Sequence, residues 1–434
     1  MNRAEALRMA TWVLLGLGAA LLIAALLLST YTEGRIAKIP LDIDTTLVSD
    51  GTGTGLDPAS LAAPPAPREG EAPKPPPGDE TCGRIPFGIN KNVPMTFQQQ
   101  VSVEAPANAD VVTLQVGSTL RRVDKQKDEG LLLAMVDFVT LNRTTALSSE
   151  DPAGGLQSPR PMEEAPASTT STTSTPTPAN PTTKPLPHEG LAYRFPFHTE
   201  KKTYPYFDPI AQKPFDANYD GEEDVNGLTT YRFTQNVGYD AENKLVDPVK
   251  YPSLYSDSVD TTVTAVAAQW GLTGDGDPCE PITMTRYYAA QRTFWVDPVS
   301  GTIVKAKDHG YHYYARDKLK PEVTYVDYTV NSTEDTVETQ VASARDERDR
   351  VGLWGRVLPI SFTALGILAL VAGGTFTFFA LRSESALIDP GLDQPDHGFF
   401  GRRAMDSGPM PAAEAQTEKI PTQRRPDVPP DRPV

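Results

Sequence analysis

TFWVDPVSGTIVK, residues 293–305, contains two runs of aromatic and β-branched residues on either side of a turn sequence. Asp297-Pro298 is typical of the start of a turn, and Gly301 can adopt the positive φ that a tight return requires. The stretch therefore predicts a β-hairpin.

Segments of similar composition lie on both sides of this hairpin. They are short and rich in aromatic and β-branched residues, and several alternate apolar and polar residues with a period of two. They cover residues 109–117, 130–141, 191–197, 227–237, 285–296 and 322–330. We expect a mainly β domain with an antiparallel, curved or half-barrel-like sheet and a few helices. Ser332 to Asp335 then resembles a helix start, and this helix is expected to continue toward the second apolar segment described next.

Two long apolar segments flank the β-rich region. Thr11 to Leu28 is 18 residues without a charge, and Val357 to Leu381 is 25. At a rise of about 1.5 Å per residue, either can cross a hydrocarbon core of about 30 Å. The first could instead be a signal peptide, but no small-residue cleavage site follows Leu28. We expect transmembrane helices at residues 11–30 and 357–381, with room for close helix packing at the glycines of the second.

The cysteines indicate the compartment, whereas the Lys and Arg counts around the two helices do not decide the orientation. Cys82 and Cys279 both lie between the apolar segments, which is consistent with one disulfide in an oxidising compartment, the alternative being two unrelated thiols. We therefore expect a double-pass protein of the cell (inner) membrane. Residues 1–10 and 382–434 would be cytoplasmic, and residues 31–350 would lie outside.

Composition indicates spacers and excludes one class of partner. The chain has 434 residues with 41 Pro, and segments 61–80, 151–190 and 382–434 are rich in Pro, Ala, Ser or Thr, so we expect them to be unfolded. The formal net charge is -16, which would repel nucleic-acid phosphates.

The usual catalytic signatures are absent from the sequence: G-x-S-x-G, the phosphate-binding loop, H-E-x-x-H and C-x-x-C. We expect a non-enzymatic protein without a cofactor or a metal ion. Gly51, Gly53 and Gly55 superficially resemble a nucleotide loop, but we interpret them as a flexible turn because no strand and helix flank them in the required order. His309 and His312 would point to opposite faces of a strand.

Residues 216–227, DANYDGEEDVNG, match the first half of a calcium loop. Gly227 stands where such a loop needs a bidentate Glu. The carboxylates of residues 216–224 could ligate calcium in another arrangement, or the segment could be a solvated acidic hairpin turn.

An aromatic set is the sequence's candidate for ligand binding. We predict that its members alternate on the faces of two strands, where they could form a cradle for acyl chains or sugars, or could be ordinary sheet core. They are Tyr193, Phe195 and Phe197 on one strand and Tyr231 and Phe233 on the other.

Several segments together resemble one family. They are PLDIDTT (40–46), HTEKKTYPYFDP (198–209), DVNGLTTYRF (224–233), the hairpin at 292–305 and GRVLPI (355–360). The chain is similar over nearly its whole length to the actinobacterial membrane-protein family catalogued as PorA-type porins. The resemblance implies a cell-envelope setting and an association with maturation of lipomannan and lipoarabinomannan, and it implies no catalytic residues. A weaker resemblance, over two segments, is to envelope lipid carriers of the LolA and mycobacterial lipoprotein type.

The apolar segments conflict with the family's porin label, because a membrane β-barrel has an apolar outer band and no need of two hydrophobic helices. Our leading hypothesis is that the external domain binds an envelope lipid or lipoglycan precursor and presents it to membrane glycosyltransferases. The alternatives are an interaction scaffold for a glycosyltransferase complex, a pore, and an enzyme that acts on glycans through unrecognised carboxylates.

Overall fold

The computed structural model of the chain describes residues 3–57, 87–125, 130–149, 154–157, 183–252, 261–272 and 277–385. Residues up to Thr377 belong to one compact unit. Of the second unit, Phe378–Val434, the structure describes only the end of a helix.

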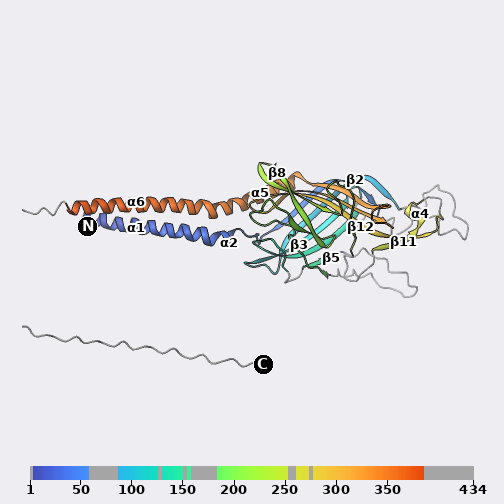
Figure 1. The fold of residues 1–434 in the computed structure, drawn as a ribbon, viewed down its shortest axis with the longest axis horizontal. Coiled ribbons are helices and arrows are strands. Elements are labelled where there is room, and N and C mark those ends of the chain that lie inside the picture. Colours follow the sequence, from blue (N-terminus) through green and yellow to red (C-terminus); the bar gives the residue numbers. More distant parts are fainter. Residues whose placement is uncertain are drawn as a thin grey trace, which may run out of the picture. The chain divides into compact units, whose positions relative to one another are not determined.

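One antiparallel sheet of 14 strands dominates the described residues (Figure 1). Its main path runs β6-β5-β4-β3-β2-β1-β14-β13-β12-β9-β8-β7, and β10 and β11 both pair with β12. The strands are β1 (Asp44–Leu56), β2 (Ile89–Glu104), β3 (Val111–Arg122), β4 (Leu131–Asn142), β5 (Gly155–Gln157), β6 (Thr183–Pro185), β7 (Tyr204–Asp208), β8 (Lys213–Val225), β9 (Leu228–Val237), β10 (Val249–Lys250), β11 (Thr262–Val266), β12 (Pro281–Val296), β13 (Ile303–Ala315) and β14 (Val323–Ser332).

The sheet curves until its two ends approach each other. Leu191 forms an antiparallel bridge with Leu147, close to the end of β4, and a parallel bridge with Tyr206 of β7. The concave side encloses a core to which β2, β3, β4, β7, β9, β12 and β14 all contribute buried side chains. The expected antiparallel, half-barrel-like domain between two long apolar helices is confirmed.

The predicted hairpin is present as β12 and β13. The Asp297 carboxylate accepts from the Ser300 amide at 2.8 Å, and Gly301 has a φ of 75°. A Cβ atom on Gly301 would also lie 2.1 Å from the carbonyl oxygen of Phe195. Glycine is therefore required at this turn both for its conformation and for the close contact with the loop that carries Phe195.

Two local predictions were wrong. Residues 191–197 are a loop, in which Tyr193 has a φ of 60° and the Phe195 amide donates to Gly301 O at 3.0 Å, and their apolar alternation reflects packing against the turn. Gly51, Gly53 and Gly55 belong to strand β1 and do not form a flexible turn. A Cβ on Gly51 would lie 1.9 Å from the Thr329 oxygen of β14, so the glycine permits a close strand approach.

The expected spacer at residues 151–190 is structured at its two described ends, where β5 and β6 pair with each other. The spacer at 61–80 and residues 386–434 of the tail lie outside the described residues. Arg382 to Ser385, expected in the tail, belong to helix α6.

Helix α1 (Arg3–Leu27) continues through the π-helical segment η1 (Leu28–Thr32) into α2 (Glu33–Ile36). At the other end, α5 (Glu334–Gly352) continues through η3 (Leu353–Val357) into α6 (Leu358–Ser385), as predicted, and the short α4 (Ala267–Trp270) precedes β12. Met9–Thr30 and the apolar part of Glu334–Phe379 are long and apolar enough to cross a membrane. Their large apolar side chains are exposed, for example Trp12 at 75% and Leu368 at 65%. Such surfaces are suited to lipid and indicate membrane association.

The two apolar helices pack antiparallel through glycines. A Cβ on Gly18 of α1 would lie 2.9 Å from the Gly366 oxygen of α6, and one on Gly373 would lie 2.9 Å from Leu15. Going along α1 from Leu15 to Gly18, the contact thus moves back along α6 from Gly373 to Gly366. The structure uses Gly366 and Gly373 for the close approach that the sequence suggested.

Helix α5 packs on the outer face of the sheet. Val337, Val341 and Ala344 are buried against residues of β8, β9, β12 and β13, which include Trp295 and Val304. The helix begins at Thr333, whose hydroxyl accepts from the Thr336 amide. The helix that continues into the apolar helix α6 is therefore bound to the sheet along its apolar stripe.

Candidate functional site

A cavity of about 180 Å³ lies on the concave side of the sheet. Most of its lining is apolar, and the side chains come from β1, β2, β3, β4, β7, β12, β13 and β14. Leu47, Phe97, Leu114, Met135, Phe207 and Phe294 are among them. The volume exceeds that of an engineered apolar cavity of about 150 Å³ that binds benzene, so it can hold one apolar segment of a larger molecule.

The wall of this cavity has a gap between β13 and β1. Strand β14 separates them but ends at Ser332, which pairs with Ser49, so residues 303–306 of β13 and 44–48 of β1 have no β14 residue in the strand register. Three hydrogen bonds to Val48 attach α5 to the edge of β1. The Val48 amide donates to the Thr336 hydroxyl at 3.0 Å, and the Val48 carbonyl accepts from the same hydroxyl and from the Thr333 amide. On the β13 side, the Ala306 amide donates to the Ser332 hydroxyl.

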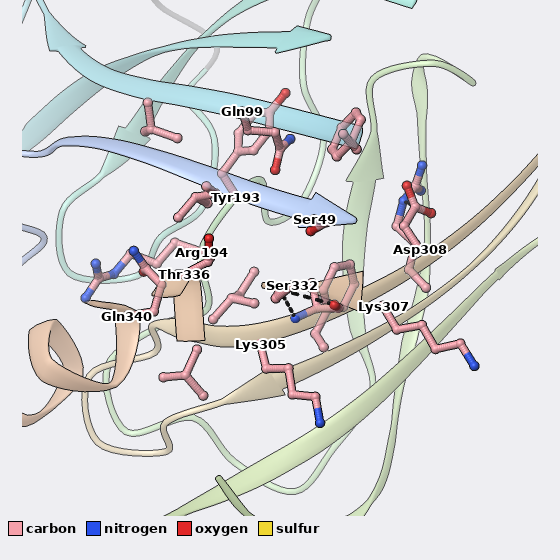
Figure 2. A pocket seen from close by; sticks show the side chains of 18 of the residues that line it. Ser49, Gln99, Tyr193, Arg194, Lys305, Lys307, Asp308, Ser332, Thr336 and Gln340 are labelled. Atoms are coloured by element: carbon pink, nitrogen blue, oxygen red, sulfur yellow. Dashed lines mark hydrogen bonds and ion pairs between the residues drawn. The ribbon is translucent and has the colours of Figure 1, made fainter. Parts of the chain in front are cut away.

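The first two turns of α5 therefore cover the gap. Thr336 and Gln340 of this helix line the cavity beside Arg194 (Figure 2). Helix α5 is continuous through η3 with α6, so the helix that covers the gap leads directly into a candidate membrane span.

A buried charged network lies at one side of the cavity. Arg292 of β12 donates to Asp208 at 2.5 Å, to Tyr288 at 2.6 Å and to Gln235 at 3.2 Å, and its Nε lies 3.2 Å from the Asp308 carboxylate. Burial lowers the pKa of Arg292, but Asp208 and the other partners outweigh it and hold this pKa well above its ordinary value. Burial raises the pKa of the Asp308 carboxyl against the opposing effect of Arg292.

Arg194 connects the cavity with α5. Its Nη2 donates to the Ser300 carbonyl at 3.0 Å and to the carboxylate of Glu347 on α5, and its guanidinium lies 5.4 Å from the centre of the Phe197 ring. Arg194 is 7% exposed, and its buried Nε has no hydrogen-bond partner among the described residues. A buried N–H donor without a partner is costly, and Nε of Arg194 is such a donor in the lining of the cavity.

Tyr193 belongs to a second polar cluster. Its hydroxyl donates to Asp137 at 2.5 Å, and the same carboxylate oxygen lies 3.0 Å from Nε2 of His188, whose Nδ1 faces the Leu186 carbonyl. Burial raises the pKa of Tyr193 well above its ordinary value, and the Asp137 charge adds to the effect. A phenol held in its neutral form in this way positions the loop that lines the cavity.

The structure separates the five aromatic residues that the sequence grouped. Of these, Tyr193 lines the cavity. Phe195 and Phe233 are fully buried and stack on each other at 4.7 Å, with Tyr204 and Tyr206 around them. Phe197 lies beneath Arg194, and Tyr231 contacts Tyr219 and Lys201. Ligand binding at this set stays a prediction, and the geometry favours Tyr193 within it.

The acidic segment 216–224 lies in strand β8, with a bulge between Tyr219 and Gly221, and does not form a loop. Arg232 pairs with Asp220 and Glu223, and Lys201 pairs with Glu222. The described residues contain no group of three His, Cys, Asp or Glu side chains that could hold a metal ion. His309 and His312 lie on opposite faces as predicted: His312 is buried and His309 pairs with Asp327. The pairing of Cys82 with Cys279 stays a prediction, because Cys82 lies outside the described residues.

Sequence reasoning missed Arg194, Arg292, Asp208, Asp308 and Glu347. A signal for two of them was present. Arg292 stands between Ala290 and Phe294, and Asp308 between Ala306 and Gly310, so each is a charged residue at an inward position of an alternating strand.

Comparison with known proteins supports the assignment that the sequence motifs suggested. A family model described as "Porin PorA" matches residues 10–375. The chain is 30% identical over 398 residues to a protein of Corynebacterium amycolatum named "Porin PorA", with 85% of this chain and 97% of the relative covered. It is 28% identical over 422 residues to a protein of the same name from Corynebacterium resistens, with 86% and 97% covered. The chain belongs to the Porin PorA family.

Proposed function

We propose that this PorA-family protein is a non-enzymatic, membrane-anchored protein of the cell envelope whose cavity binds the apolar part of an envelope lipid or lipoglycan precursor. The observation that carries the proposal is the apolar cavity inside the curved sheet, with its wall closed by a helix that continues into the membrane. Apolar pockets with a few convergent polar groups are typical of sites for amphiphilic ligands.

In this proposal the bound molecule is a precursor in the maturation of lipomannan and lipoarabinomannan, and membrane glycosyltransferases are the partners that receive it. The support is the lipoglycan association that the family resemblance implies, together with a cavity whose covering helix α5 is continuous with the apolar helix α6. Both termini would be cytoplasmic, and the sheet domain would be extracytoplasmic.

The relatives' printed name makes a pore the second candidate. The outer face of β9, β12, β13 and β14 is polar, with Thr234, Gln291, Lys307, His309 and Thr329 around a shallow depression. A strand surface facing lipid would carry an apolar band in their place. The geometry therefore favours a domain outside the bilayer, and a pore would have to be built by the helices or by other copies.

Filling the cavity tests the lipid-binding proposal. Ala306 lines the cavity, so Ala306→Phe should occupy part of its volume and reduce the bound apolar ligand. We expect native mass spectrometry of the full chain, purified in detergent from an actinomycete, to show a co-purifying lipid that is reduced in this variant. In a strain lacking the protein, the variant should fail to restore the lipomannan and lipoarabinomannan profile.

Thr329→Phe is the matched control, because Thr329 lies on the outer face of the neighbouring strand. It should retain the lipid and the lipoglycan profile. A folded wild-type protein without any co-purifying lipid, which still restores the profile, would favour the scaffold. Ion conductance of the wild type in planar bilayers would favour the pore.

A further inference from the structure

The charges around the cavity are unlike those of the chain as a whole. The protein has a formal net charge of -16, yet the charged residues that line the cavity are Arg194, Arg292, Lys305, Lys307 and Asp308. Burial raises the pKa of the one carboxyl among them, Asp308. Four of the five charged residues that line the cavity are thus basic, and buried carboxylates of Glu347 and Asp208 pair with its two arginines.

The basic residues differ in their availability. Arg292 is engaged by Asp208 and lies beside Asp308. Lys305 and Lys307 lie at the rim, and Figure 2 shows their side chains directed away from the cavity. Arg194 is engaged through Nη2 by Glu347 and Ser300, but its buried Nε has no hydrogen-bond partner among the described residues, and the residue lines the cavity next to α5.

We propose, building on the lipid-binding function above, that the ligand is an amphiphile with an anionic phosphate head, and that Arg194 binds this head at the gap covered by α5. The apolar chain enters the part of the cavity that Leu114, Met135 and Phe97 line. A phosphate suits a guanidinium because two of its oxygens can accept hydrogen bonds from two N–H groups of the planar guanidinium at once.

Glu347 connects anion binding at Arg194 with the attachment of helix α5. Glu347 is buried on α5 and pairs with Arg194, so a phosphate head and Glu347 compete for the same guanidinium. Binding of the head would weaken the one ion pair that joins the cavity lining directly to α5 in the described part of the chain. Conversely, removal of the Glu347 charge should favour the anion.

A competition between two lipids tests this proposal. The full chain in detergent is mixed with equimolar 1-oleoyl lysophosphatidic acid and 1-oleoyl glycerol, which share the chain and differ in the phosphate, and bound species are counted by native mass spectrometry. We expect the wild type to prefer the phosphate by about tenfold, the contribution of roughly one charge-assisted hydrogen bond. Glu347→Gln should increase the preference.

The double variant Arg194→Gln/Glu347→Gln should bind the two lipids equally. Removal of both partners avoids a buried unpaired carboxylate, so this variant is expected to fold. Arg232→Gln, which changes an arginine on the outer face, is the control and should keep the wild-type preference.

The outcomes separate the two proposals. Equal binding of the two lipids by the wild type would overturn the phosphate site and leave the apolar cavity intact as a binding site. Binding of neither lipid would contradict the proposed function itself. A phosphate preference that survives in the double variant would overturn the assignment to Arg194.

Discussion

Asp308 is the residue of the cavity at which pH should act on stability. Its carboxyl faces Arg292 of β12 and Tyr328 of β14, with Asp208 of β7 and its neighbour His309 close enough to act on it. Burial raises its pKa above the ordinary Asp value of 3.8, so the folded state holds the proton more tightly than the unfolded chain does. Its contribution to stability is therefore complete below pH 3.8 and is lost as the pH rises through the raised pKa.

We expect the wild type to unfold at a higher temperature than Asp308→Asn near pH 4. This difference in unfolding temperature should decrease toward neutral pH, because the ionised carboxylate of the wild type is then buried at a cost in free energy. The measurement is thermal unfolding of the full chain in detergent from about pH 4 to 7. Asp110→Asn, which changes an exposed carboxylate outside the cavity, is the control variant. A difference for Asp308→Asn that increases with pH would contradict this account.

At the scale of single residues, the sequence predicted roles that depend on local conformation. Gly301 is required by its own φ and by its contact with Phe195, and the Asp-Pro-x-x-Gly pattern indicated the turn. The contact between Arg292 and Asp208 joins residues 84 positions apart, and no local pattern specifies such a pair. The charged residues of the candidate site could therefore be identified only after the fold had brought them together.

The two apolar helices provide a prediction at the scale of elements. Gly18 and Gly16 belong to the same helix, but a Cβ on Gly18 would lie 2.7 Å from Leu370, whereas one on Gly16 would meet nothing within 4 Å. Gly18→Leu should therefore force α1 and α6 apart, and Gly16→Leu should not. We expect Gly18→Leu to lower the unfolding temperature of the full chain by several degrees, corresponding to overpacking costs of roughly 1–3 kcal/mol.

Both variants place the same side chain in an apolar helix, so a general effect of leucine on insertion would affect them equally. A second readout is cross-linking between cysteines introduced at Leu15 and Gly373, which contact each other across the helix pair. This cross-link should form in the Gly16→Leu background and be reduced in the Gly18→Leu background. Equal behaviour of the two variants would show that α1 and α6 do not pack through Gly18.

Elements were predictable where side-chain periodicity coincided with secondary structure. The helices, β3, β4, β9, β12 and β14 have this property, and their predicted ranges overlap the observed ones. Strand β1 was missed because glycine is a weak strand former, although Gly51 and Gly53 stand where a Cβ would clash with the backbone of β14. Residues 191–197 alternate like a strand, but they are held by the hairpin turn and by Tyr206 at the closing edge of the sheet.

At the scale of the whole molecule, the order of the strands in the sheet could not be predicted from the sequence. Strand β1 lies between β2 and β14, so the first strand of the sheet pairs with the last. The pairing of β1 with β14 joins two strands that are separated in sequence by most of the domain. The core that the curved sheet encloses stabilises this pairing. A curved antiparallel sheet could be predicted from composition and hairpin signals, whereas the cavity, its gap and the covering helix follow from where β14 ends.

The antiparallel helix pair makes a prediction about topology. Because Leu15 contacts Gly373 and Gly18 contacts Gly366, we expect the start of α1 and the end of α6 to lie at the same face of the bilayer. In a Cys82→Ser/Cys279→Ser background, single cysteines are introduced as Asn2→Cys, Lys320→Cys and Val434→Cys. A membrane-impermeant maleimide applied to intact cells should label the cysteine at position 320, whose lysine side chain is 81% exposed in the wild type.

The cysteines at positions 2 and 434 should react only after the membrane is permeabilised. Labelling of these two in intact cells, with position 320 protected, would reverse the orientation and place the cavity in the cytoplasm, where extracytoplasmic lipoglycan precursors could not reach it. Labelling of one terminus without the other would contradict the helix pair itself, because a chain with an odd number of crossings cannot bring Gly18 and Gly366 together in this antiparallel arrangement. The same three variants therefore test the packing of the helices and the compartment that the proposed function requires.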